Sequence, residues 1–165
     1  MNFNLLLEAA QSAEETFAMG NVIAYLGLAL CVVLCGCGSA IALYHTGQTG
    51  SGVLAEDPKK FSKVLVMVVL PATQGIYGFV LAIVGQSSIV GALTVQQGWG
   101  ILFACLPLAI SGLTSALFQA KTAVAGIYAL AKEESLSGKL ILFPAMVETY
   151  AILGLVISLL MLQAV

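Results

Sequence analysis

Charge is the first thing that this sequence lacks. Only 8% of its 165 residues are charged, and all six of its basic residues are lysines, so it contains no arginine. Soluble domains carry about 25% charged residues, and a chain without a basic stripe has nothing to pair with nucleic-acid phosphates. We therefore exclude a water-facing globular domain and expect no nucleic acid among the partners. Hydrophobic residues make up 60% of the chain, which makes lipid the expected solvent of its exterior.

Cysteine and histidine are also scarce. Three of the four cysteines, Cys31, Cys35 and Cys37, lie close together but lack the paired Cys-x2-Cys spacing of a zinc site. Close helix packing by small residues is therefore favoured over metal binding. The single histidine, His45, is expected to be an interhelical hydrogen-bond donor. Lys121 is expected to extend its ammonium toward a membrane surface.

Four long apolar stretches follow one another along the chain. They run from about Met19 to Tyr44, Val64 to Val84, Trp99 to Phe118 and Leu140 to Leu162. Each is near or above the ~20 residues that a helix needs to cross a hydrocarbon core of about 30 Å. The sequence therefore predicts an all-α membrane protein, with residues 1–165 forming a single membrane domain of four transmembrane helices.

Lysines flank two of the three connections between these stretches. Lys59, Lys60 and Lys63 flank the first connection, Lys132 and Lys139 flank the third, and the second connection carries no charge. Because positively charged loops stay in the cytoplasm, we predict a multi-pass protein of the cell membrane. Its first and third loops are expected in the cytoplasm and both termini outside the cell.

The four stretches form two hairpins that resemble each other, at about residues 17–86 and 98–163. The aligned blocks are Gly38–Tyr44 with Gly112–Phe118 and, after a one-residue slip, Leu70–Tyr77 with Phe143–Tyr150. The second pair of blocks shares Pro-Ala and a later tyrosine at the same spacing, which predicts a parallel duplication. In this alignment Gly75 takes the place of Glu148, so the chain keeps one acid per four helices.

A carboxylate is predicted in the middle of the fourth span. Glu148 follows Lys139 by nine residues, which is ~13 Å along an α-helix. A charged side chain at that depth costs ~2.5–3.5 kcal/mol on insertion scales, and intramembrane acids usually mark ion or proton paths. We therefore expect Glu148 to be the functional centre.

Polar groups from other helices are expected at the same depth as Glu148. Reflection across the third loop, together with the repeat alignment, brings four side chains there: Gln119, Thr73, Gln74 and Tyr77. Pro71 lacks an N–H and frees a carbonyl in the preceding turn, at Leu70 or just before it. Such oxygen atoms suit a hard cation such as Na⁺, whereas a proton needs only the acid and an apolar pocket. The residues therefore favour Na⁺ and leave H⁺ as the alternative.

Three stretches carry a specific resemblance to a known family, and they are Leu70–Phe79, Phe118–Gly126 and Phe143–Gly154, the last with a Glu-Thr-Tyr-Ala motif. Nearly the whole chain resembles the proteolipid (K or c) subunits of V-type, archaeal-type and related bacterial rotary ATPases, of the sodium-binding kind. The resemblance implies that many copies form a rotor ring in lipid and that Glu148 carries the ion. It also implies a Na⁺ site formed by Leu70, Thr73, Gln74, Gln119 and Glu148, with Tyr77 hydrogen-bonding the carboxylate.

The same resemblance implies partners that this chain does not contain. A stator membrane subunit is expected to supply an arginine, and central-stalk subunits are expected to contact the cytoplasmic loops. ATP would be hydrolysed or synthesised in a soluble head, so the chain is not expected to be an enzyme on its own. Three alternatives stay open. The first is the same ring protein with H⁺ as its cargo, and the second is a stand-alone ion transporter, which would predict several intramembrane charges. The third is a structural proteolipid of a membrane junction, which would not require Glu148.

Overall fold

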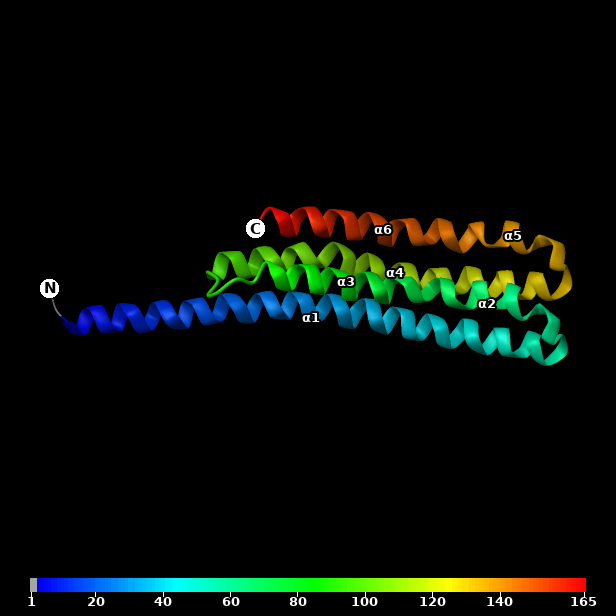
Figure 1. Cartoon of the computed structure of the whole chain (residues 1–165), viewed down its shortest axis with the longest axis horizontal. Helices are drawn as coiled ribbons and strands as arrows, with labels where there is room; N and C mark the ends of the chain where they lie inside the picture. The colour runs from blue at the N-terminus through cyan, green and yellow to red at the C-terminus, as the bar shows by residue number, and fades with distance from the viewer. Residues whose placement is uncertain (1–2) are drawn as a thin grey trace.

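The computed structural model describes the backbone of residues 3–165, and all regular structure in that range is helical. In chain order the elements are α1 (Phe3–Glu56), η1 (Pro58–Lys60), α2 (Phe61–Val69), η2 (Leu70–Ala72), α3 (Thr73–Ser87), α4 (Val95–Lys132), η3 (Glu134–Leu136), α5 (Ser137–Leu140) and α6 (Leu142–Gln163). The start of α1 and the C-terminus point to one end of the bundle, and the turns at η1 and η3 lie at the other (Figure 1).

Four helical segments are long and apolar enough to cross a membrane, which confirms the predicted four-helix architecture. They are Met19–Glu56, Pro58–Ser87, Val95–Lys132 and Glu134–Gln163. The first and third have 38 residues each, or roughly 57 Å at 1.5 Å per residue, so they exceed the predicted spans. The two helices extend beyond these spans because their side chains still pack there. Val53 of α1 is buried in one cluster with Met67 of α2 and Ile127 of α4.

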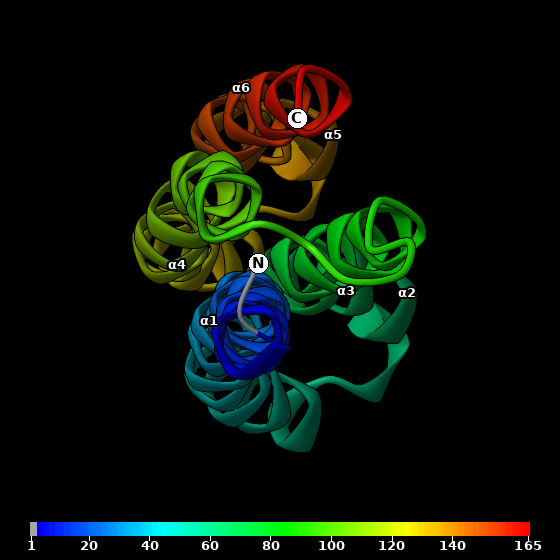
Figure 2. The same cartoon turned by 90° about the vertical axis from the view of Figure 1, so that its left-hand side faces the viewer.

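Small residues bring α1 and α4 into close contact. A Cβ atom added to Gly27 would lie 2.5 Å from the Cα atom of Leu102, so a larger residue there would push the two backbones apart. Seen end on, α3 lies beside both α1 and α4, and α6 lies beside α4 (Figure 2). The second hairpin is therefore displaced from the first and keeps its orientation.

The landmarks of the first hairpin recur 76 residues later. Asp57 and Glu133 each begin a 3₁₀ turn in extended conformation, with φ of −142° and −139° and ψ of 92° and 97°, and each accepts a hydrogen bond with its side chain. Further pairs with this spacing are the helix ends Glu56 and Lys132, and Ser87 and Gln163. We call two residues that are 76 positions apart counterparts.

The counterpart of Glu148 is Ala72, so the predicted pairing of Glu148 with Gly75 is wrong. That alignment matched Pro71 with Pro144, but the two prolines have different structural roles. Pro71 lies in η2, which interrupts the helix between α2 and α3. Pro144 lies in the first turn of α6, where the absence of an N–H costs little.

Polar contacts join the two turns at the far end of the bundle. Lys63 Nζ lies 2.8 Å from a carboxylate oxygen of Glu134, and Lys60 Nζ donates a hydrogen bond of 2.7 Å to the Ala131 carbonyl. The Ser135 hydroxyl donates to Glu133 and, with the Ser135 N–H, holds the pKa of that carboxyl below its usual value. Exposed ion pairs stabilise little, so these contacts orient the turns more than they stabilise the fold.

Candidate ion-binding site

Glu148 lies halfway along the fourth membrane-length segment and is half-buried. The Thr73 and Tyr77 hydroxyls of α3 each donate a hydrogen bond of 2.6 Å to its Oε1 atom. Gln119 of α4 donates from Nε2 to Oε2 at 3.3 Å. Donors from two other helices therefore hold both carboxylate oxygens, which offsets part of the cost of placing the acid in lipid.

A second layer of polar groups fixes the side chains behind Glu148. Gln74 and Gln119 are completely buried, and the Gln74 amide nitrogen donates to Gln119 Oε1 and, at 3.2 Å, to Ser115 Oγ. The Ser115 hydroxyl in turn donates to the Val147 carbonyl at 3.1 Å. Buried amides are retained where they are hydrogen-bonded, so this network orients the oxygens around the carboxylate.

The cluster holds more oxygen acceptors than hydrogen-bond donors. Gln74 Oε1 is buried and has no hydrogen-bond partner within residues 3–165, a situation that costs ~1–3 kcal/mol. The single hydroxyl hydrogen of Thr73 lies within reach of both Leu70 O, at 3.1 Å, and Glu148 Oε1, at 2.6 Å. Hard cations prefer oxygen ligands, so an excess of oxygen atoms around a carboxylate suits such a cation.

The break at η2 places Leu70 and Thr73 at the site. Because Pro71 has no N–H, the regular ladder is interrupted, and the Thr73 N–H instead bonds the Leu70 carbonyl across η2. The Val68 carbonyl, which precedes the break, accepts a hydrogen bond of 3.0 Å from the buried Thr46 hydroxyl. Of these two carbonyls, the Leu70 carbonyl is the one that lies next to the cluster.

The structure brings together all the residues predicted for the site, which are Leu70, Thr73, Gln74, Tyr77, Gln119 and Glu148. Their role as ion ligands stays a prediction. The repeat alignment placed the α3 residues correctly by depth despite its wrong register, because a shift of three residues is ~4.5 Å along a helix. Ser115 was missed, although it precedes Gln119 by four residues and so shares its helix face.

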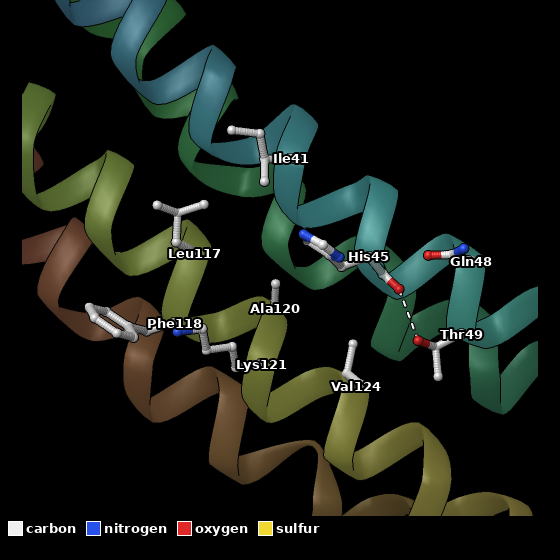
Figure 3. A pocket seen from close by; sticks show the side chains of 9 residues that line it. All are labelled: Ile41, His45, Gln48, Thr49, Leu117, Phe118, Ala120, Lys121 and Val124. Atoms are coloured by element: carbon white, nitrogen blue, oxygen red, sulfur yellow. Dashed lines mark hydrogen bonds between the residues drawn. The ribbon is translucent and has the colours of Figure 1, made fainter.

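His45 and Lys121 are counterparts, and they line a different cavity between α1 and α4 (Figure 3). It has a volume of about 480 Å³ and is lined by Ile41, His45, Gln48, Thr49, Leu117, Phe118, Ala120, Lys121 and Val124. None of these residues hydrogen-bonds Glu148 in the part of the chain that the structure describes. The Lys121 ammonium lies 5.2 Å from the centre of the Phe118 ring, a cation–π contact.

The cysteines serve the packing of helices. Cys35 is buried, and a Cβ atom added to Gly112 of α4 would lie 2.6 Å from its sulfur. The same side chain would meet a Cβ atom added to Gly78 of α3 at 2.6 Å. Across the described residues no three His, Cys, Asp or Glu side chains gather as a metal site would require. Of the four cysteines, Cys37 alone is exposed.

A protein-family model matches this chain twice. It describes the C subunit of ATP synthase and covers residues 26–84 and again residues 102–161. The two matches begin 76 residues apart, which is the spacing of the structural counterparts. The family model therefore divides the chain into the same two units as the fold.

Curated relatives cover most of the chain. The V-type sodium ATPase subunit K of Enterococcus hirae is 44% identical over 142 residues, which is 86% of this chain and 91% of the relative. The A-type ATP synthase subunit K of Methanocaldococcus jannaschii is 40% identical over 87% of this chain and 63% of its own length. The 16 kDa proteolipid of the human V-type proton ATPase is 26% identical over 86% of this chain and 91% of its own length. This chain is therefore a member of the family of ATP synthase C subunits.

Proposed function

We propose that this chain is the ion-carrying subunit of a membrane rotor ring and that Glu148 carries Na⁺. Family membership and the relatives named as subunit K support the rotor role. One of these relatives is named as part of a sodium ATPase. The observation that carries the choice of Na⁺ is the buried Gln74 Oε1, an acceptor without a donor beside a carboxylate.

In this proposal Na⁺ is the cargo, and the oxygens around Glu148 replace its hydration shell. The ligands would be the Glu148 carboxylate, the Thr73 hydroxyl, the Leu70 carbonyl and the amide oxygens of Gln74 and Gln119. All five residues belong to the cluster, in which the Gln74 oxygen is the acceptor without a donor. Binding would relieve the unpaired Gln74 oxygen and cancel the charge of Glu148 in one step. The Tyr77 hydroxyl would keep the carboxylate oriented throughout.

Transport follows from the cost of the uncompensated charge in lipid. With Na⁺ bound, Glu148 is neutral overall and can pass through lipid as the ring turns. Loss of the ion exposes a carboxylate that needs a positive partner, and this chain has no arginine. A stator subunit would supply that arginine. ATP hydrolysis or synthesis would occur in a soluble head, so the chain itself would not be the catalyst.

The lysine distribution supports an orientation for the ring. Lys59, Lys60 and Lys63 lie at the first turn and Lys139 follows the second, which favours the cytoplasmic side for both turns. The central stalk would then contact the turns at η1 and η3. The start of α1 and the C-terminus would lie on the opposite side of the membrane.

Carbodiimide labelling of Glu148 tests this proposal. Membranes holding the intact complex are treated at one fixed pH with and without Na⁺, and ionic strength is balanced with choline. We expect labelling of Glu148 to slow as Na⁺ rises and to saturate, because the ion replaces the proton that the reagent requires. A Glu148→Gln chain is the control, because it removes this carboxyl while keeping its shape.

The alternative cargo gives a different result. If labelling ignores Na⁺ and slows only as pH rises, the ring carries H⁺ and the sodium proposal is wrong. If Glu148 is not labelled under any of these conditions, it is not an accessible acid, and the carrier role itself is wrong.

A further inference from the structure

Thr46 is a fully buried polar residue of α1. Its hydroxyl lies 3.0 Å from the Val68 carbonyl of α2, and 3.1 Å and 3.4 Å from the Ala42 and Leu43 carbonyls of its own helix. A hydroxyl has a single hydrogen to donate, so these carbonyls share it. The shortest of the three contacts is the one that crosses to α2.

The Val68 carbonyl loses its ordinary donor at the break in the second membrane segment. In a continuous α-helix it would accept from the N–H four residues later, at Ala72. Ala72 lies in η2, where a 3₁₀ turn bonds each N–H to the carbonyl three residues back, as the Thr73 N–H does with Leu70. Lipid offers no water to replace the lost donor. The Thr46 hydroxyl therefore supplies, from another helix, a hydrogen bond that the break removes.

The second hairpin uses the same residue type differently. The counterpart of Thr46 is Thr122 of α4, whose hydroxyl donates at 2.8 Å to the Gln119 carbonyl of its own helix. The counterpart of Val68 is Pro144, in the first turn of α6, and α6 continues from there without a break. The threonine beside the broken helix is thus the one whose hydroxyl bridges two helices.

The form of the break determines where the Leu70 carbonyl points. In a continuous α-helix this carbonyl would lie along the helix axis and accept from the N–H four residues later. Across η2 it accepts from the Thr73 N–H and lies 3.1 Å from the Thr73 hydroxyl, which also bonds Glu148. If Val68 regained the Ala72 N–H, the segment would approach a regular helix, and the Leu70 carbonyl would turn away from the cluster.

We propose that Thr46 is a positioning residue for the transported cation. By bonding the Val68 carbonyl, it keeps η2 in its 3₁₀ form and the Leu70 carbonyl directed at the ion. This inference rests on the proposed sodium site, and it adds to that site a residue of α1, a helix that supplies none of the proposed ligands. Thr46 does not touch the ion and acts only through the main chain at η2.

The two candidate cargoes depend on this contact to different degrees. Beyond the break α3 is held by Gln74, which donates to Gln119 of α4. Loss of the Thr46 hydroxyl should therefore leave Glu148 and its α3 donors in place. A proton binds to the carboxylate itself, whereas Na⁺ also requires the Leu70 carbonyl. Thr46 should consequently matter for Na⁺ and not for H⁺.

Replacement of Thr46 tests this role in membranes that contain the assembled complex. Thr46→Val keeps the shape and removes the donor, so the Na⁺ concentration that half-protects Glu148 from carbodiimide should rise about 3- to 10-fold, the effect of one net hydrogen bond. The pH profile of labelling without Na⁺ should stay that of the wild type. Thr46→Ser keeps the hydroxyl and should restore wild-type protection. Thr122→Val is the matched control and should leave protection unchanged.

A second pair of variants tests the route through the break. Pro71→Ala restores the N–H that η2 lacks, so the helix no longer depends on Thr46 at this point. In that background Thr46→Val should raise the Na⁺ concentration further by less than about 2-fold, and an undiminished effect would mean that Thr46 acts elsewhere. If Thr46→Val rings do not assemble, Thr46→Cys replaces them: its weaker S–H donor should give a rise of about 2- to 5-fold, and no rise would overturn the inference.

The results separate this inference from the proposed function. If Na⁺ protects the wild-type and Thr46→Val rings alike, the positioning role is wrong while the sodium site stands. If Thr46→Ser loses as much protection as Thr46→Val, or if the pH profile shifts together with Na⁺ protection, Thr46 only packs the bundle and the inference is wrong. If Na⁺ does not protect the wild-type ring, the proposed function fails and the inference fails with it.

Discussion

The two hairpins of this chain follow a similar backbone path but carry different side chains at most counterpart positions. At counterpart positions they keep Ser39 of α1, which contacts α3, and Ser115 of α4, which contacts α6. They differ at positions where the second hairpin provides residues of the ion site. The counterpart of Gln119 is Leu43, and the counterpart of Glu148 is Ala72. The packing of the two hairpins is thus shared, while the polar cluster takes its residues from α3 of the first hairpin and from α4 and α6 of the second.

The α3 side of the site differs in the same way. Gln74 and Tyr77 have Tyr150 and Leu153 as counterparts, whereas Thr73 has Thr149. The second hairpin therefore has no amide at the counterpart of Gln74 and no hydroxyl at the counterpart of Tyr77, the two groups that α3 of the first hairpin provides.

Moving the acid from one hairpin to the other should have the largest effect. We expect Glu148→Ala combined with Ala72→Glu to abolish Na⁺ transport, because the relocated carboxylate would meet Leu43 in place of Gln119. A charge without partners at this depth costs ~2.5–3.5 kcal/mol, so ring yield should also fall. Transport is measured as ²²Na⁺ uptake into vesicles, and yield is measured on native gels. Uptake near the wild-type rate would mean that a carboxylate at residue 72 can also carry the ion, which contradicts the proposed difference between the hairpins.

Removal of the buried amide at Gln74 should have the next largest effect. Gln74→Leu has nearly the same shape but lacks the unpaired Oε1 atom and the donor to Gln119. We take the contact of the Gln74 oxygen with Na⁺ to be worth as much as a hydrogen bond to a charged group, about 1.5–3 kcal/mol, so the Na⁺ concentration for half-protection against carbodiimide should rise about 10- to 150-fold. Gln86→Leu, at an exposed glutamine of the same helix, should leave it unchanged. An equal rise of this Na⁺ concentration in both variants would mean that Gln74 is not part of the ion site.

A smaller effect is expected from the tyrosine hydroxyl. Tyr77→Phe removes a donor to Glu148 Oε1, but Thr73 still donates to the same atom. We therefore expect roughly a 3- to 10-fold loss of Na⁺ affinity, corresponding to about one net hydrogen bond. The matched control is Tyr150→Phe, because Tyr150 lies two residues beyond Glu148 and is 69% exposed. Isothermal titration of purified rings with Na⁺ would separate the two variants.

The sequence predicted the four helices well because lipid imposes a simple rule. Each hydrophobic run that is long enough must be a helix, since unpaired backbone groups cannot be hydrated there. The apolar runs end at Tyr44 and Phe118, before α1 and α4 end at Glu56 and Lys132, because hydropathy marks the lipid and not the helix. Packing of Val53 against α2 extends α1 beyond the apolar run.

The register of the duplication was harder to predict from the residues. The proline and tyrosine motif has the same spacing in both hairpins, but Pro71 breaks a helix and Pro144 begins one. Their chemical identity says nothing about which of these roles each proline has. The family model and the helix ends both give a spacing of 76 residues. The cluster around Glu148 could still be predicted because polar side chains are so few that depth alone selects them.

Replacement of the two retained serines should have the smallest effect, and it tests whether the two hairpins pack in the same way. Ser39 Oγ accepts from the Gly75 N–H at 2.9 Å, and Ser115 Oγ donates to the Val147 carbonyl. Ser39→Ala and Ser115→Ala should each lower stability by about 0.5–1.5 kcal/mol, measured as the temperature at which the ring dissociates. Only Ser115 also accepts from Gln74, so only its variant should weaken Na⁺ protection, by about 2- to 3-fold. Weaker protection in the Ser39 variant would mean that the contact of Ser39 with Gly75 also positions the α3 residues of the ion site.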